Sequence, residues 1–249
     1  MPKDITLIIV DNSNHELAKF AVEKTLTVVD CKEVITFSDR PLVQGAKFIP
    51  IRKNIDLYDY SEIMTKQLWT YVETEHVLTI QWDGLAVNAN LWDDDFLKYD
   101  YIGALWKWPI NGQYVGNGGF SLRSRKLLEA LRDTQVQLGT ELSGQNEDVA
   151  IAVEYRNLME TEYDIKYATP QVAAKFATEN VWQGPTLGFH GLWNIPRFLS
   201  RTEIEYVIKN IPSYFWNDLS KVQSLLDTLV EQNYRDIAEQ IYLKVTQGN

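Results

Sequence analysis

The sequence predicts an α/β fold, with a mostly parallel mixed sheet flanked by helices and a helical hairpin at the C-terminal end. Two apolar runs rich in β-branched residues, 5–10 and 76–80, each end in a polar segment, which is typical of buried strands that stop at a ligand-binding edge. An amphipathic helical pattern follows the first run and leads to a second short strand at 34–37. Strand, helix and strand in this order predict a parallel pair joined by a crossover.

The other elements are predicted by the same patterns. Further strands are expected at 47–51, 101–105 and 120–122, and further helices at 60–74, 125–132, 147–159 and from residue 170. From residue 210 onward, apolar residues at helical spacing predict two helices joined near Gln232 and Asn233, with Leu219 on the inward face of the first. We therefore expect an α/β domain over residues 1–200 and a helical appendage over residues 201–249. The hairpin either covers an exposed face or forms a homodimer.

Composition restricts the class of partner. The net charge of −10 over 249 residues argues against nucleic acid, which is bound through clustered Lys and Arg. No apolar run approaches the ~20 residues of a transmembrane helix, and the start of the chain lacks the apolar segment of a secretory signal. The expected location is therefore cytoplasmic, with the inner face of the membrane as an alternative. The single cysteine, Cys31, excludes an intramolecular disulfide.

Two residues are candidate metal ligands. Asp83 lies in Gln81-Trp82-Asp83-Gly84, directly after the strand 76–80, where a carboxylate is placed to hold Mg²⁺ or Mn²⁺. His190, one of three histidines, lies between Phe189 and Gly191 after an apolar segment. The alternatives are a loop-capping aspartate and a structural histidine. For the acidic run 93–95, a solvated helix start is favoured over a metal site.

Two further motifs suggest a binding site and a base. The segment Gly116-Asn117-Gly118-Gly119 lets a backbone approach a ligand closely, but it has neither the Lys-Ser/Thr pair of a P-loop nor the spacing of a dinucleotide-binding loop. Its alternative is a tight turn. Glu147 and Asp148 begin a predicted helix, where acids are ordinary, but where a carboxylate is also available as a general base.

In this order, the four motifs resemble those of GT-A-fold, nucleotide-sugar-dependent glycosyltransferases. The chain looks most like a largely bacterial family with Gln-x-Asp-Gly, Gly-Asn-Gly-Gly-Phe-Ser-Leu-Arg-Ser, Glu-Asp-Val and Gly-Phe-His-Gly motifs, and the resemblance runs from about residue 5 to residue 193. It implies a Rossmann-like GT-A fold and a divalent cation, Mn²⁺ or Mg²⁺, held by Asp83 and His190. It also implies that the donor is contacted by five residues of the first two motifs: Gln81, Trp82, Asp83, Gly118 and Gly119.

The resemblance also implies a reaction. A sugar would pass from a nucleotide-diphosphate donor to a hydroxyl of a glycan acceptor, as in polysaccharide biosynthesis, with Asp148 as the base of an inverting enzyme and Glu147 holding the acceptor. By position, Asp11 and Asp39 would contact the nucleoside, and Lys66 would contact the diphosphate. The first motif keeps only the last acid of the Asp-x-Asp pattern of such enzymes.

Two other functions remain open at this point. A sugar nucleotidyltransferase would share the fold and the metal-diphosphate chemistry, but such enzymes usually carry a Gly-rich, basic loop after the first strand, where this chain has residues 11–14, Asp-Asn-Ser-Asn. A non-catalytic carbohydrate-binding module would instead use Trp106, Trp108 and Trp182 as stacking platforms.

Overall fold

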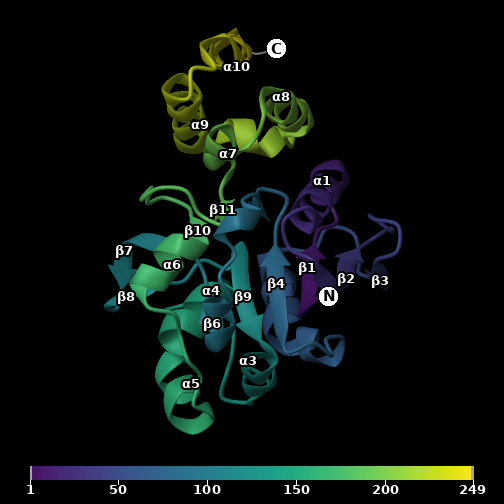
Figure 1. The fold of residues 1–249 in the computed structure, drawn as a ribbon, viewed down its shortest axis with the longest axis vertical. Coiled ribbons are helices and arrows are strands. Elements are labelled where there is room, and N and C mark those ends of the chain that lie inside the picture. The colour runs from purple at the N-terminus through teal and green to yellow at the C-terminus, as the bar shows by residue number, and fades with distance from the viewer. Residues whose placement is uncertain (1, 248–249) are drawn as a thin grey trace. The chain divides into compact units, whose positions relative to one another are not determined.

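The computed structural model describes residues 2–247 and divides the chain into two compact units, Met1–His190 and Gly191–Asn249 (Figure 1). All the strands among the described residues lie in the first unit, and the second is helical. The elements agree with the predicted fold class, and the domain boundary expected after residue 200 stays a prediction.

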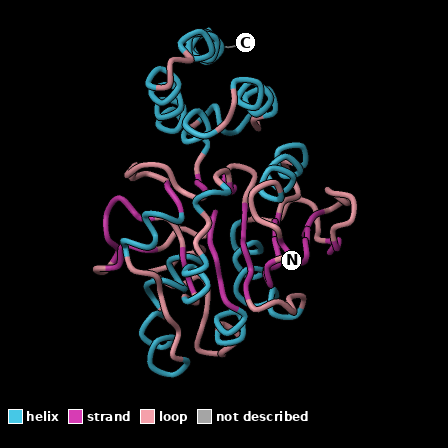
Figure 2. The backbone as a smooth tube through the Cα atoms, in the orientation of Figure 1, coloured by secondary structure: helices cyan, strands magenta, loops and turns pink. Residues whose placement is uncertain are grey.

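The main sheet of the first unit has six strands in the order β3-β2-β1-β4-β9-β6. Figure 2 draws strands in magenta and helices in cyan. The strands are β1 (Lys3–Val10), β2 (Cys31–Ser38), β3 (Lys47–Pro50), β4 (His76–Ile80), β6 (Tyr101–Ile102) and β9 (Phe120–Ser124). The first four are parallel, and β9 runs antiparallel between β4 and β6. The predicted mostly parallel, mixed sheet is therefore confirmed.

The strand expected at 101–105 is wrong in its extent. The chain leaves the sheet after Ile102, and a separate hairpin forms from β7 (Leu105–Ile110) and β8 (Gln113–Val115). Gly103 explains the break, because its backbone lies so close to the next segment that an added Cβ would be 1.6 Å from the carbonyl oxygen of Gly116. A residue with a side chain has no room where Gly103 lies against the backbone of Gly116.

Helices flank the sheet. They are α1 (His15–Leu26), α2 (Leu57–Glu62), α3 (Arg125–Ala130), α4 (Glu147–Val149), α5 (Arg156–Tyr163) and α6 (Pro170–Phe176). The helices predicted at 60–74 and 147–159 are each interrupted by a π-helical turn, at Ile63–Gln67 and Ala150–Glu154, and the first ends at Thr70. A π turn adds a residue to one turn and so breaks the 3.6-residue period from which both helices were predicted.

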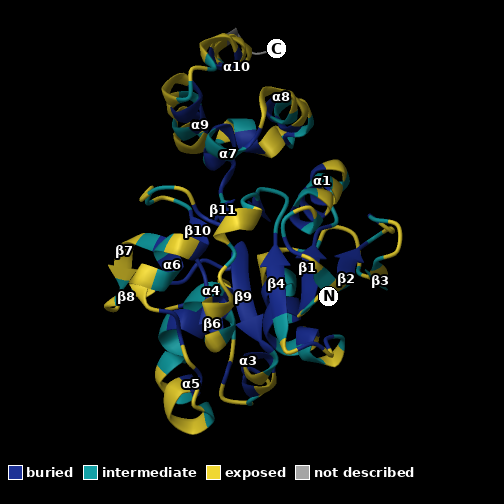
Figure 3. Ribbon diagram, in the orientation of Figure 1, coloured by how far each residue is buried: buried dark blue, intermediate teal, exposed yellow. Residues whose placement is uncertain are grey.

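The core explains why these strands were recognisable. Every residue of β1 from Ile5 to Val10 is buried, as are residues 77–80 of β4 (Figure 3). On one face, Ile8 and Val10 pack with residues of β2 and with the helical segment after α2. Burial on both faces gives the continuous apolar runs that parallel strands require.

A second, three-stranded sheet brings two distant motifs together. It consists of β10 (Ala177–Thr178), β11 (Gly188–His190) and β5 (Gly84–Ala86), in the order β10-β11-β5. β5 and β11 are antiparallel, and Gly84 is the register partner of His190. Because β5 begins directly after Asp83, this pairing places the first and last motifs side by side.

The second unit contains α7 (Ile195–Phe198), α8 (Arg201–Asn210), α9 (Leu219–Glu231) and α10 (Arg235–Gln247). α9 and α10 form the predicted hairpin, with Asn233 at a φ of 65° in the connection. Leu219 is 67% exposed rather than inward-facing, because it is the first residue of α9. Among the described residues, no helix has both the length and the apolar character needed to cross a bilayer.

Candidate functional site

The structure brings Asp83 and His190 together. Two backbone hydrogen bonds between Gln81 and Gly84, both 3.0 Å long, close a tight turn with Trp82 and Asp83 at its tip. Asp83 Oδ1 lies 3.8 Å from His190 Nε2, and both side chains are partly exposed, at 17% and 18%. The two candidate ligands, far apart in sequence, therefore face each other across the β5–β11 pairing.

The His190 ring is held at both nitrogens. Nδ1 lies 3.2 Å from Glu179 Oε1, and Nε2 lies 3.1 Å from Gln81 Oε1. Burial alone lowers the pKa of His190, but the negative charges of Asp83 and Glu179 outweigh it and raise the pKa to about 9. The Gln81 amide nitrogen donates to the Tyr60 hydroxyl at 2.9 Å, so the amide oxygen is the atom that faces His190.

The glycine motif makes room for side chains of the site itself. A Cβ on Gly119 would lie 2.3 Å from the His190 ring, and one on Gly118 would lie 1.9 Å from Glu147 Oε1. A Cβ on Gly84 would lie 2.5 Å from the carbonyl oxygen of Gly119. These close contacts explain why glycine is required at all three positions. A contact of Gly118 and Gly119 with a donor remains a prediction.

Glu147 is the partner of a buried arginine. Its Oε1 accepts a hydrogen bond of 2.9 Å from Arg123 Nη2, and the Arg123 side chain is completely buried. Arg123 Nε also donates to Ser121 Oγ at 3.1 Å, and that hydroxyl lies 2.6 Å from Thr79 Oγ1. This chain of contacts joins α4 to β9 and β4. The Glu147 carboxylate is thus directed into the protein, and an acceptor contact at this residue remains only a prediction.

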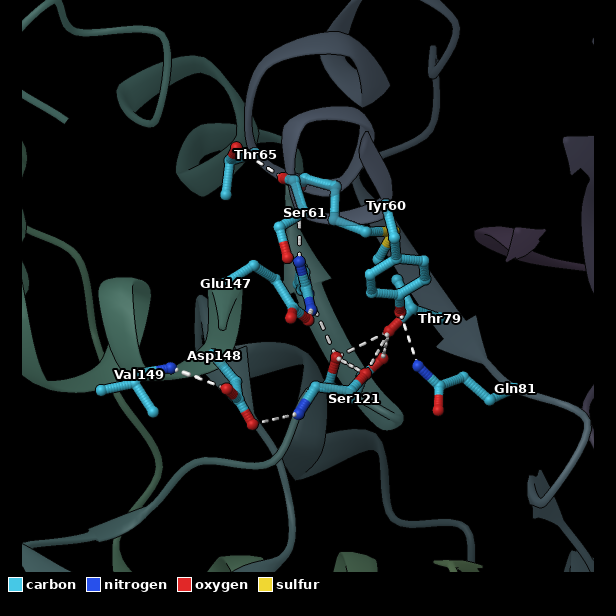
Figure 4. Close-up of polar contacts among 12 residues, drawn as sticks. Tyr60, Ser61, Thr65, Thr79, Gln81, Ser121, Glu147, Asp148 and Val149 are labelled. Atoms are coloured by element: carbon cyan, nitrogen blue, oxygen red, sulfur yellow. Dashed lines mark hydrogen bonds and ion pairs between the residues drawn. The ribbon is translucent and has the colours of Figure 1, made fainter. Parts of the chain in front are cut away.

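Asp148 is half-buried, and no arginine or lysine among the described residues is hydrogen-bonded to it. Its carboxylate accepts the backbone N–H of Gly118 at 3.2 Å and of Val149 at 2.8 Å (Figure 4). Burial, together with the charge of Glu147, raises the pKa of Asp148 to about 6. The charge of Asp148 in turn contributes to the raised pKa of His190, so the two groups lie within electrostatic reach. A carboxylate with such a pKa is suited to exchange protons near neutral pH.

Asp11 and Asp39 follow β1 and β2 at the same edge of the sheet as Asp83. Asp11 accepts the backbone N–H groups of Ser13 and Asn14 at 2.9 and 2.6 Å, and so shapes the loop before α1. Burial raises the pKa of Asp11, and the charge of Asp83 contributes further. Asp39 binds His15 Nε2 at 2.5 Å, and this hydrogen bond lowers the pKa of Asp39.

Lys66 and Trp82 are placed differently. The Lys66 amine donates to the carbonyl oxygens of Leu131 and Asp133, at 2.6 and 2.9 Å, and so binds the chain beyond α3 rather than the Asp83 turn. Trp82 lies half-buried in that turn. Its contact with a donor stays a prediction.

The acidic run 93–95 forms an exposed helix start, as favoured from the sequence. Asp93 accepts the backbone N–H of Asp95, Asp94 pairs with Lys3, and Asp95 pairs with Lys98. Each acid therefore has its own partner at the surface.

Three residues of the site were not identified from the sequence: Tyr60, Arg123 and Glu179. Arg123 did leave a signal, because a charged side chain inside the buried strand Phe120–Ser124 requires a buried partner of opposite charge. Tyr60 and Glu179 left none, since each lies in a segment with no motif and reaches its partner only through the fold.

The donor atoms at the Asp83 turn fit one kind of cation site. They are Gln81 Oε1, Asp83 Oδ1 and His190 Nε2. Ligands of Mg²⁺ or Mn²⁺ lie about 2.1 Å from the ion, so atoms 3.8 Å apart fit within one coordination sphere. Across residues 2–247, no group of three His, Cys, Asp or Glu could hold a metal by itself. The set therefore fits a cation shared with substrate phosphates, and it does not fit a self-contained structural site.

Comparison with known proteins gives a family and a few distant structures. Residues 47–190 match a family model described as "Protein of unknown function (DUF5672)". No curated protein matches the chain. Glucosyl-3-phosphoglycerate synthase from Mycobacterium tuberculosis, solved with Mn²⁺, UDP and glucosyl-3-phosphoglycerate, is 11% identical with a TM-score of 0.43, over 66% of this chain and 68% of that chain.

The bifunctional IspDF from Campylobacter jejuni is 13% identical, with a TM-score of 0.39 over 60% of this chain. This chain spans 47% of the length of IspDF. TM-scores of this size carry no information about the chemistry of this chain.

Proposed function

The chain belongs to the DUF5672 family, and we propose that it is a nucleotide-sugar-dependent glycosyltransferase that moves a sugar from a nucleoside diphosphate to a hydroxyl of a glycan. The observation that carries the proposal is the convergence of Asp83 and His190, 3.8 Å apart, within electrostatic reach of the half-buried carboxylate of Asp148. A phosphate-binding cation site beside a candidate base is what a transfer from a diphosphate to a hydroxyl requires.

The first part of the site would bind the donor. Asp83, His190 and the Gln81 amide oxygen would hold a divalent cation, which when bound supplies Lewis-acid stabilisation of the charge on the leaving diphosphate. Asp11 and Asp39 follow adjacent parallel strands, at the edge where α/β sheets bind ligands, and this position supports contacts with the nucleoside. Lys66 is left out of this part, because its amine is bound to carbonyl oxygens beyond α3.

The second part of the site would activate the acceptor. Asp148 would take the proton of the acceptor hydroxyl as its oxygen forms a bond to the anomeric carbon and the bond to the diphosphate breaks. Two backbone N–H groups fix the orientation of the carboxylate. Because burial raises the pKa of Asp148 to about 6, the side chain is ionised at neutral pH and still accepts a proton readily. Attack assisted by such a base on the side opposite the diphosphate gives inversion.

Glu147 would act indirectly in this account. The buried ion pair with Arg123 fixes the first turn of α4 against β9, and Asp148 is the next residue of that turn. The ion pair therefore sets the position of the base without touching the substrate.

The proposal is tested by comparing three variants with the wild-type chain. Asp148→Asn should lower turnover of a nucleotide sugar by about 100-fold or more and keep binding of nucleoside diphosphate with Mn²⁺, because only the base is removed. Asp83→Ala and His190→Ala should lose both turnover and Mn²⁺-dependent binding. Donors would be found by screening nucleotide sugars for thermal stabilisation, since a ligand that binds only the native state raises its stability.

Asp95→Ala, at an exposed acid, is the control and should behave as wild type. Normal turnover in the presence of a chelator would show that the reaction does not need a divalent cation. Release of pyrophosphate from a nucleoside triphosphate and a sugar phosphate, with no turnover of nucleotide sugars, would identify a sugar nucleotidyltransferase. Binding of glycans, with no calorimetric heat from nucleoside diphosphates or Mn²⁺, would identify a carbohydrate-binding module.

A further inference from the structure

We propose that Glu179 is a positioning residue that turns the His190 ring so that its Nε2 atom faces a divalent cation at Gln81 and Asp83. The inference rests on the cation site of the proposed function. Glu179 follows β10 directly, and the parallel register pairs Ala177 with Gly188 and Thr178 with Phe189. The next residues in this register are Glu179 and His190, so the small sheet itself sets the two side chains side by side.

The contact decides which ring nitrogen is offered to the site. Glu179 Oε1 lies 3.2 Å from Nδ1, and the Glu179 side chain is only 11% exposed. A carboxylate in this position accepts the Nδ1 hydrogen and holds it there, so the ring proton that a cation would displace is the one on Nε2. Histidines that bind metals usually donate their other ring N–H to a carboxylate or a carbonyl group, which fixes the tautomer and raises the basicity of the ligand.

The surroundings of His190 leave the ring little freedom to turn by itself. A Cβ added to Gly119 would lie 2.3 Å from both Cδ2 and Nε2 of His190, so the ring packs closely on the glycine backbone. On the other side of the site, Tyr60 accepts the Gln81 amide N–H at 2.9 Å and directs the amide oxygen toward Nε2. Glu179 and Tyr60 supply no donor atom themselves. They orient His190 Nε2 and Gln81 Oε1 toward the same cation position.

The test measures Mn²⁺ affinity of the whole chain, from the electron paramagnetic resonance signal of free Mn²⁺, with and without UDP as a probe. Glu179→Ala should weaken Mn²⁺ binding by about 10- to 100-fold. Glu179→Gln should weaken it less, because an amide oxygen still accepts the Nδ1 hydrogen without the charge. Glu160→Ala is the matched control: this carboxylate also pairs with a cationic side chain, Arg156 at 2.8 Å, and its loss should leave the affinity unchanged.

A second measurement separates positioning from a general loss of structure. Pulsed electron paramagnetic resonance of bound Mn²⁺ should show coupling to an imidazole nitrogen in the wild type and in Glu179→Gln. The coupling should be absent in His190→Ala and weakened in Glu179→Ala. If the alanine variant fails to fold, Glu179→Gln is tested instead, with Glu160→Gln as its control. The Mn²⁺ affinity of Glu179→Gln should then be several-fold weaker than that of the wild type.

The outcomes distinguish this inference from the proposed function. Wild-type affinity and an intact nitrogen coupling in Glu179→Ala would overturn the positioning role and leave the cation site in place. Wild-type Mn²⁺ binding in both Asp83→Ala and His190→Ala would show that no cation is held there, and would overturn the cation site together with the role of Glu179.

Discussion

Two acidic regions of the first unit differ in exposure and in how their charges are paired. In the run 93–95, Asp94 and Asp95 are 77% and 65% exposed, and each pairs with its own lysine. At the site, the carboxylates of Asp83, Glu147 and Glu179 are at most 17% exposed, and they pair with Arg123 or His190.

The difference shows which acidic side chains are suited to take part in a reaction. A hydrogen bond from Trp92, together with Lys3, lowers the pKa of Asp94, as expected for an acid at the surface. At Asp148 burial dominates and raises the pKa to about 6. A run of acids in a sequence is therefore a weaker sign of function than a few acids that the fold removes from water.

The largest effect is expected where a buried pair is broken. Glu147→Ala leaves the Arg123 guanidinium buried without its carboxylate, and loss of one member of a buried ion pair costs about 3–5 kcal/mol of unfolding free energy. Urea denaturation of Glu147→Ala and of the exposed control Asp95→Ala would measure the contrast. Equal midpoints for the two variants would show that the Glu147–Arg123 pair does not hold α4 in place.

The sequence predicts those parts of the fold that depend on local patterns of apolar and polar residues. Burial on both faces gives β1 and β4 their apolar runs, and the polar ends of these runs marked the edge at which Asp83 lies. These two features depend on residues that are neighbours in sequence. The convergence of Asp83 with His190 depends instead on the antiparallel pairing of β5 with β11.

The parts that could not be predicted depend on contacts between distant segments. The π-helical turns at 63–67 and 150–154 leave no periodic signal, and so the helices containing them were predicted with the wrong extent. Glu179 reaches His190 only because β10 and β11 pair in one register. The role of the glycines was also hidden, since the groups that fill the space beside Gly118 and Gly119 come from α4 and β11.

A smaller effect with a defined pH dependence is expected at Asp148. The folded pKa of about 6 lies above the ordinary value of 3.8, so the folded chain binds the proton more tightly. This group therefore contributes stability below about pH 4, and the contribution is lost as the pH rises through 6. Asp148→Asn stays neutral and should be more stable than wild type above pH 6, on the order of 1 kcal/mol, with the difference vanishing below pH 4.

Melting temperatures of the wild type and of Asp148→Asn, measured from pH 4 to pH 8, would show this divergence. Asp94→Asn is the exposed control, and its melting temperature should follow that of the wild type over the same range, because water screens the groups that lower the pKa of Asp94. If the two Asp148 curves run parallel over the whole range, the carboxyl is not shifted by burial, and its suitability as a base has to be reconsidered.

The smallest effect is expected at the exposed run. Asp94 accepts hydrogen bonds from Lys3 Nζ at 3.0 Å and from Trp92 Nε1 at 2.7 Å, but its side chain is 77% exposed, so water replaces the lost contacts. Asp94→Asn should leave the urea midpoint at neutral pH unchanged within error, and 1 M NaCl should remove any residual difference, since salt screens exposed pairs. A loss as large as that of Glu147→Ala would mean that Asp94 anchors the segment after β5, and that exposure is not what separates the two acidic regions.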